Sequence, residues 1–262
     1  MKFIIFLSFF SAIALAQTVS FDCEAMPDIC TNMCWAVHCT AGKWRAQLTY
    51  DAVSKTVNRR RRRAAGCMPS PNRCSVKSGY QAGFNCDEYP FASVSESDAG
   101  GQSNRCVHTG QNSAQGGTLN AFYRNLAPGT RFLVAFLNPT KGGTKYCTNG
   151  ANVCVNDGNQ HTKAGVQANP PGNRWTPRSL ASSGAYLYKT ASGKDLSSPE
   201  LFEIGHEFVT VVPVNQTSYE LLLESQDEDA SSQLADPDFY TLKTDVIVEK
   251  LDQGLGERDL SD

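Results

Sequence analysis

Residues Gly83–Ala92, Gly-Phe-Asn-Cys-Asp-Glu-Tyr-Pro-Phe-Ala, place two adjacent carboxylic acids inside an otherwise apolar and aromatic stretch. We predict that the chain is extended from Asn85 to Val94, and neighbouring side chains of a strand point to opposite faces. Asp87 and Glu88 therefore cannot both be solvated if one face packs on the core. A buried carboxylate needs a metal ion, an arginine or backbone N–H groups as its partner. A second interpretation is a turn before the proline, in which the aspartate caps backbone amides.

Segments on both sides of this stretch have strand patterns. Arg45–Tyr50 alternates, and Arg131–Leu137 is rich in Phe, Val and Leu, which is typical of a buried strand. Further strand-like segments lie at 185–189, 208–214 and 244–251.

One helix is predicted at Gly117–Leu126, because its apolar residues recur at helical spacing and Pro128-Gly129 marks its end. Ser95–Asn104 is a polar, glycine-rich loop, and Lys141–Arg178 is a long excursion rich in Gly, Asn and Pro. Together these patterns predict an α+β fold.

The first sixteen residues have the pattern of a signal peptide. Lys2 is their only charge, an apolar run follows, and Ala14-Leu15-Ala16 supplies small residues before a cleavage site. An uncleaved N-terminal anchor is the alternative. No later run is long enough to span a membrane, so we expect a secreted protein without a membrane partner. Asn215-Gln216-Thr217 is a glycosylation acceptor, which fits export.

All ten cysteines lie in the first two thirds of the chain. Export makes disulfides the expected state, although the pairing cannot be deduced from spacing. One disulfide loop is expected from Cys147 to Cys154. The Cys30–Cys34–Cys39 cluster allows a zinc site as an alternative, but its spacing is not a standard one and has no matching second half. The cysteines are Cys23, Cys30, Cys34, Cys39, Cys67, Cys74, Cys86, Cys106, Cys147 and Cys154.

Charge is distributed unevenly along the chain. Residues 224–262 contain twelve acidic and three basic residues, a formal charge of −9. The whole chain carries −2, so residues 17–223 carry +6 once Lys2 is set aside. A basic body suits a polyanionic partner, although ordinary surface charge is an equal alternative.

Gly83–Ala92 resembles the central motif of the NucA/NucB deoxyribonuclease family, whose bacterial members have Gly-Tyr-Asp-Arg-Asp-Glu-Trp-Pro-Met-Ala. Three more segments resemble that family in the same order. Asn58-Arg59-Arg60 is similar to an upstream Arg-Arg element, Asn112–Gly117 to Asp-Asn-Arg-Gly-Ala-Gly, and Gly129–Val134 to a closing Gly-Thr-Arg-hydrophobic strand. The resemblance covers about residues 45–138, and the cysteine layout is similar to the fungal branch.

The resemblance implies a small antiparallel sheet with a ββα-metal nuclease core and a divalent cation, Mg²⁺ or Mn²⁺. Asp87 matches the catalytic aspartate and would be the general base, with Glu88 in a supporting role. Asn112 matches a metal ligand. Gln115 and Asn120 are further candidates for contacts with the metal, its waters or phosphate. Such a cation, bound by few protein oxygens, retains several waters.

The chain departs from the bacterial motif at three positions, where Asn85, Cys86 and Ser113 replace charged residues of the family. The basic run Arg59–Arg63 allows three interpretations. Arg59, Arg60 and Arg61 contact phosphates, or the run is a processing site, or it is a solvated helix face. His108 lies near the predicted site and is a candidate for an assisting role.

The predicted function is therefore that of a secreted, metal-dependent endonuclease that hydrolyses DNA, with RNA as a further candidate substrate. Its rival is a catalytically impaired, disulfide-rich secreted protein or effector that binds nucleic acid or another ligand, and a third interpretation is a toxin matured at the arginine run. The predicted divisions are a signal peptide at 1–16, a cysteine-tied segment at 17–66, a nuclease-like core at 67–138, a β-rich elaboration at 139–224 and an acidic, partly disordered tail at 225–262.

Overall fold

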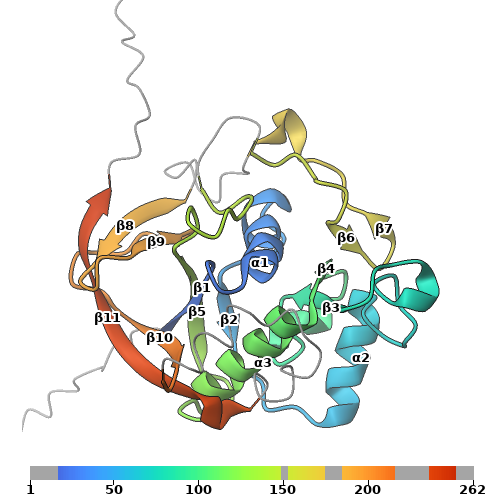
Figure 1. The fold of residues 1–262 in the computed structure, drawn as a ribbon, viewed down its shortest axis with the longest axis horizontal. Coiled ribbons are helices and arrows are strands. Elements are labelled where there is room, and N and C mark those ends of the chain that lie inside the picture. The colour runs from blue at the N-terminus through green and yellow to red at the C-terminus, as the bar shows by residue number, and fades with distance from the viewer. Residues whose placement is uncertain (1–16, 149–152, 175–184, 216–235, 252–262) are drawn as a thin grey trace, which may run out of the picture.

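The computed structural model describes residues 17–148, 153–174, 185–215 and 236–251 (Figure 1). The predicted signal peptide, most of the acidic linker and the last eleven residues lie outside these ranges. Within them, no helix combines the length and apolar character needed to cross a membrane.

The largest sheet of the described residues has seven strands, of which six close into a barrel (Figure 1). The barrel closes because β1 pairs in parallel with β5 on one side and with β10 on the other. The short strand β2 (Gln47–Thr49) adds to β5. The barrel strands are β1 (Gln17–Asp22), β5 (Arg131–Leu137), β8 (Tyr186–Thr190), β9 (Asp195–Ser198), β10 (Glu207–Pro213) and β11 (Tyr240–Leu251).

This mixed barrel differs from the small antiparallel sheet expected from the resemblance. The difference arises at β1, where apolar Val19 and Phe21 alternate with Thr18 and Ser20. The apolar pair packs in the main core, while Ser20 hydrogen-bonds Thr210 of β10 at 3.0 Å. Strand β1 pairs through its backbone with β5 and β10, and the strands of the C-terminal part therefore share the barrel with β5.

Two apolar clusters lie on the two faces of the barrel wall. Phe132, Val134 and Phe136 of β5 belong to the main core, which also contains the buried faces of the helices. Ala135 and Leu137 point the other way and pack with side chains of β8–β11. A strand that is buried on both faces reads as a continuous apolar run, which is why Arg131–Leu137 was predicted with its observed bounds.

Three α-helices of the described residues lie outside the barrel. They are α1 (Pro27–Cys39), α2 (Lys55–Ala65) and α3 (Thr109–Tyr123). Helix α1 lies between the barrel and a second sheet, and every residue from Ile29 to Cys39 is buried (Figure 1). Helix α2 begins after Ser54, whose hydroxyl accepts the Val57 N–H, and ends at Gly66 with φ of 89°.

The second sheet holds the motif stretch. Its strands are β3 (Phe84–Tyr89), β4 (Ser103–His108), β6 (His161–Thr162) and β7 (Gly165–Val166), in that spatial order. Strands β3 and β4 are antiparallel, with Asp87 opposite Arg105, and β4 continues directly into α3. The predicted loop 95–104 thus ends inside β4. The predicted helix begins eight residues before Gly117, because its polar first turns face the motif stretch instead of the apolar core.

All ten cysteines are paired in five disulfides, as predicted, which leaves none for zinc. The expected loop from Cys147 to Cys154 is wrong, because each of these cysteines reaches back to α1. They pair with Cys34 and Cys39, which lie five residues apart on that helix. The remaining disulfides are Cys23–Cys30, Cys67–Cys86 and Cys74–Cys106.

Candidate functional site

A cleft of about 230 Å³ lies beside β3 and is walled by α2 and α3. Strand β3 is the outer strand of its sheet, so the cleft borders an unpaired edge. Five residues predicted as a site from sequence line this one cleft. They are Asp87, Glu88, Asn112, Gln115 and Asn120. The other lining residues are Asn58, Arg62, Phe91, Ala92, Ser93, Gly116, Leu119 and Tyr123.

Asp87 is 2% exposed and is held by a side chain that sequence reasoning missed. The amide Nδ2 of Asn32, on α1, donates to Asp87 Oδ2 at 2.7 Å and approaches its backbone oxygen at 3.4 Å. Burial raises the pKa of Asp87 to about 6, although the hydrogen bond from Asn32 favours the charged form. No local sequence signal marks Asn32, which follows Thr31 in a cysteine-rich segment with other polar residues.

Glu88 is also buried, and its partner is Arg62 of α2. The Nε atom of Arg62 lies 3.4 Å from Glu88 Oε1. Burial raises the pKa of Glu88 to about 7, and the neighbouring charge of Asp87 adds to this shift, while Arg62 opposes it. Burial therefore raises the pKa of both adjacent carboxyl groups in one cleft, an arrangement that is common at catalytic sites.

Arg62 was not among the three arginines predicted to bind phosphate, yet it is the one arginine of the described residues that lines this cleft. It shares a face of α2 with Asn58, because residues four positions apart are neighbours on a helix. Helical spacing from Asn58 would have selected Arg62 within the run.

Arg61 and Arg60 have a different role in the structure. Arg61 is 2% exposed and donates to both carboxylate oxygens of Asp98, to Asp51 at 2.7 Å and to the Ala92 carbonyl at 3.1 Å. Arg60 donates to the same Asp98 at 2.6 Å. These bonds fix the chain at Ala92, which lines the cleft, so Arg61 supports the site from behind and offers no free face to phosphate.

We expect Arg61→Met to lower the free energy of unfolding by about 3 kcal/mol, because it removes a buried cation and leaves its partners unsatisfied. The matched variant Arg60→Met removes an exposed ion pair and should cost less than about 1 kcal/mol. Urea unfolding of both variants measures the difference. Equal losses would show that the buried network does not hold the cleft wall.

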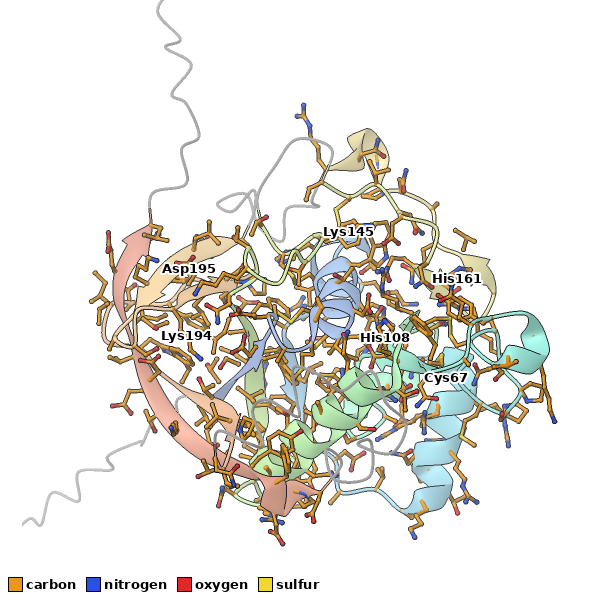
Figure 2. The ribbon with its side chains drawn as sticks, viewed as in Figure 1. Cys67, His108, Lys145, His161, Lys194 and Asp195 are labelled. Carbon is orange, nitrogen blue, oxygen red and sulfur yellow. A yellow bond between two sulfur atoms is a disulfide. The ribbon has the colours of Figure 1, made fainter. Side chains whose placement is uncertain are left out.

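The departures from the bacterial motif lie outside the cleft lining. Asn85 is exposed, Cys86 bonds Cys67, and Ser113 is half-buried on α3. His108 (Figure 2) stands where β4 meets α3, and its ring lies tilted against that of Phe84, with centroids 4.2 Å apart. His108 does not line the cleft either. The three positions at which this chain lacks a charged residue of the bacterial motif therefore lie near the cleft but do not line it.

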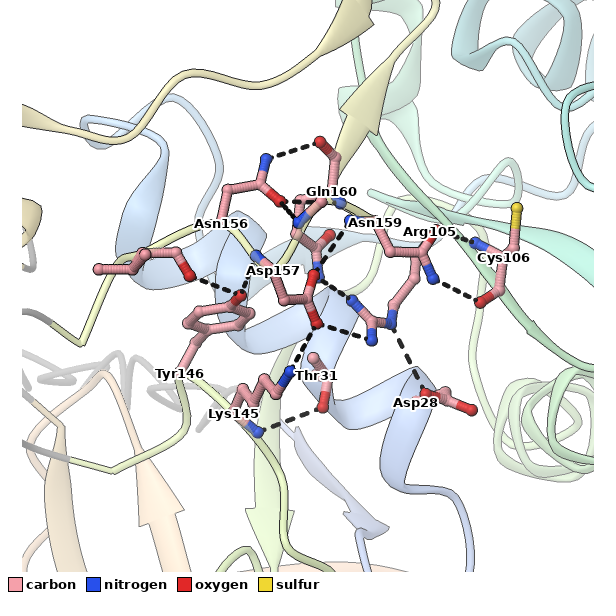
Figure 3. Close-up of polar contacts among 12 residues, drawn as sticks. Asp28, Thr31, Arg105, Cys106, Lys145, Tyr146, Asn156, Asp157, Asn159 and Gln160 are labelled. Carbon is pink, nitrogen blue, oxygen red and sulfur yellow. Dashed lines mark hydrogen bonds and ion pairs between the residues drawn. The ribbon is translucent and has the colours of Figure 1, made fainter.

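Arg105 faces Asp87 across the hairpin but is engaged elsewhere. Its guanidinium pairs with Asp157 at 2.9 Å and lies 3.6 Å from Asp28 of α1 (Figure 3). Lys145 joins the same Asp157 at 3.0 Å. These contacts hold the pKa of Asp157 down to about 2, against its burial. This network joins α1 and β4 to Lys145 and Asp157, whereas Arg62 is the cation whose charge acts on both buried carboxyl groups.

The donor set of the cleft fits a hard divalent cation. Within the described residues, no three His, Cys, Asp or Glu side chains gather in a way that would hold a metal by themselves. The cleft instead combines two carboxylates with the amides of Asn112, Gln115 and Asn120. The buried amide of Gln115 lies beside Asp87, where its N–H group favours the charged form of that carboxylate.

Residues 33–135 match the family model described as deoxyribonuclease NucA/NucB. The match contains every residue that lines the cleft, and Asn32 lies one position before it. It begins inside α1, nearly two turns after the helix starts, and therefore earlier than the resemblance at about residue 45 indicates. No curated protein matches the chain. Similarity to a nuclease family thus coincides with the part of the fold that builds the site.

Proposed function

We propose that this protein is a secreted, metal-dependent endonuclease that hydrolyses phosphodiester bonds of DNA in the cleft between α2 and α3. The observation that carries the proposal is the convergence of Asp87, Glu88 and three amides on one cleft, within the segment similar to NucA/NucB deoxyribonucleases. RNA is a second candidate substrate, because no residue of the cleft lining is assigned a contact that would distinguish deoxyribose from ribose.

Asp87 is proposed as the general base. Its Oδ2 is held by Asn32, so Oδ1 is the oxygen that accepts a proton from the attacking water. Burial without a full counter-charge keeps the carboxylate basic enough to take that proton near neutral pH. Asn32 therefore orients the base, and it does so from a helix locked by two disulfides.

Glu88 and Arg62 are proposed to work as a pair. Arg62 is half-buried, with 37% of its side chain exposed, so it can reach a phosphate at the cleft mouth while Glu88 holds its Nε. A guanidinium in this position stabilises the negative charge that develops on the phosphate. Glu88 in turn fixes the orientation of that guanidinium.

The amide oxygens of Asn112, Gln115 and Asn120, which line the same cleft, are the groups that would hold Mg²⁺ or Mn²⁺. A cation bound there supplies charge stabilisation for the phosphate and the leaving oxygen. No three His, Cys, Asp or Glu side chains of the described residues gather as a metal site, so a cation held by amide oxygens would keep several of its waters.

Secretion is proposed from the apolar N-terminal sequence and is supported by five disulfides, which form in oxidising compartments. Asn215 is exposed, as a glycosylation site requires, and the rest of that acceptor lies outside the described residues. Maturation at the arginine run is less favoured, because the run lies in α2 and Arg61 is buried there.

The test is digestion of plasmid DNA by the purified full chain. We expect cleavage with Mg²⁺ or Mn²⁺ that stops when EDTA removes the cation, and supercoiled plasmid should pass through nicked and linear forms as an endonuclease requires. The assay is repeated with a single-stranded RNA to rank the two substrates. Salt-sensitive DNA binding without cleavage under any divalent cation would instead support the non-catalytic binder.

A further inference from the structure

A second hollow of about 280 Å³ adjoins the cleft on the outer side of α2. The two share Asn58 and Arg62 of α2, so they adjoin along the helix. Every charged residue of its lining is basic. The lining consists of Val53, Lys55, Asn58, Arg59, Arg62 and Met68, and we call it the basic groove.

The bases of α2 divide into two sets with different partners. Arg60 and Arg61 point to Asp98 and are neutralised there. Lys55 and Arg59 are exposed and form no ion pair with any residue of the described ranges. Arg63 is exposed and without an ion pair among the described residues too, but it does not line the groove, so Lys55 and Arg59 are the uncompensated bases of α2 that border it.

The spacing of this face suits a chain of phosphates. Lys55, Arg59 and Arg62 follow one another at intervals of four and three residues, so they lie on one face of the helix. With a rise of about 1.5 Å per residue, they span about 10 Å along the axis. That length accommodates more than one phosphate of an extended nucleic-acid strand, and Arg62 at the end of the row also lines the catalytic cleft.

We propose that the basic groove binds the phosphates that flank the scissile bond on one side of a nucleic-acid strand. The proposal rests on the nuclease function proposed for the cleft and adds a strand path to it. Lys55 and Arg59 hold the flanking phosphates, Arg62 stands at the boundary with the scissile phosphate, and Val53 and Met68 offer apolar contact to sugars or bases. The occupant is identified by charge complementarity and by continuity with the cleft.

One consequence concerns substrate length. A dinucleotide has a single phosphate and cannot use the groove, whereas a longer strand gains contacts that are made away from the reacting atoms. The protein should therefore favour long strands, with an advantage that depends on Lys55 and Arg59. This preference would suit an endonuclease, because both the groove and the cleft must be filled by one continuous strand.

The experiment compares Lys55→Gln/Arg59→Gln with Arg60→Gln, which removes one exposed charge from the same helix outside the groove. Binding of a fluorescent single-stranded DNA is measured by anisotropy in EDTA over a range of salt. The double variant should bind about tenfold more weakly, and the slope of log affinity against log salt should fall by about 1.4, because two phosphate contacts are lost. Arg60→Gln should change affinity less than twofold.

With divalent cation, the ratio of kcat/KM for a long strand over a dinucleotide should fall about tenfold in the double variant and stay constant in Arg60→Gln. An unchanged ratio and salt slope in the double variant, with wild-type cleavage intact, would overturn the groove and leave the proposed nuclease standing. If the wild type binds DNA without cleaving it and the double variant loses this binding, the result would support the basic groove and contradict the proposed nuclease function.

Discussion

Replacing Asp87 with asparagine will lower the rate of DNA cleavage by about 10²–10⁴-fold, the range lost when a general base is removed. The substitution keeps the shape of the side chain and its acceptor for the Asn32 amide, which donates at 2.7 Å. What it removes is the ability to take a proton from water. Initial rates of plasmid nicking, with either divalent cation, measure the loss.

The same variant should not lose stability, and this separates a catalytic from a structural aspartate. Burial raises the folded pKa of Asp87 to about 6, above its usual value near 4. A raised carboxyl pKa means that the protonated form favours folding. That contribution is complete below the unfolded pKa and is lost as pH rises through about 6. At pH 8 the wild type therefore carries an ionised buried group, which asparagine lacks.

Activity and stability thus depend on pH with opposite signs. Cleavage requires the carboxylate, so the rate should fall as pH drops through about 6, and a bound cation will move this limit to lower pH. Urea unfolding at pH 5 and pH 8 should show Asp87→Asn equal to or more stable than wild type at the higher pH. Asp238→Asn, a 79% exposed carboxylate paired with Arg124, is the control and should change neither property. A variant that loses rate and stability together at pH 8 would contradict the assignment.

The lining of this cleft could be predicted from sequence because its residues lie within local motifs. Asp87 and Glu88 occur side by side, and Asn112, Gln115 and Asn120 fall on successive turns of one helix. Short-range patterns of this kind can be recognised in the sequence without knowledge of the fold. Strand β5 was predictable for the same reason, since seven consecutive residues carry the signal.

Contacts between distant parts of the chain were not predictable in this way. Asn32 meets Asp87 across 55 residues, and nothing in its own neighbourhood marks it as a partner. Helix α1 was hidden because its three cysteines, which pair with a neighbouring residue and with distant loops, obscure the helical pattern. Closure of the barrel depends on β1 pairing with strands more than a hundred residues away, and such pairing leaves only an alternation of apolar and hydroxyl side chains in the sequence.

The second large effect expected is a loss of stability that is much greater for two disulfides together than for either one alone. Cys34–Cys147 and Cys39–Cys154 each close more than a hundred residues, and they run side by side. Once one of them is formed, the other closes only a small ring made of the segments 34–39 and 147–154. Chain entropy then predicts a loss of about 3 kcal/mol for removing either bridge, and about 8 kcal/mol for removing both.

Double alanine variants at each bridge, and the quadruple variant, test this by urea unfolding under oxidising conditions. Cys23→Ala/Cys30→Ala is the control, because that bridge closes a separation of 7 residues and should cost about 2 kcal/mol, independently of the others. Simple additivity of the two long bridges would show that they do not share one loop in the unfolded chain.

Loss of both bridges should also reach the site, because they anchor the helix that carries Asn32. A domain of ordinary stability holds about 5–15 kcal/mol, so the quadruple variant will be largely unfolded or close to it. A variant that lacks only one of the two long bridges will remain folded, because the other bridge still ties α1 to the distant segment. It should keep its cleavage activity. Cleavage activity that changes little when one bridge is removed and is lost when both are removed would follow the pattern of stability. It would show that these disulfides support catalysis by keeping α1 beside β3, where Asn32 holds Asp87 Oδ2.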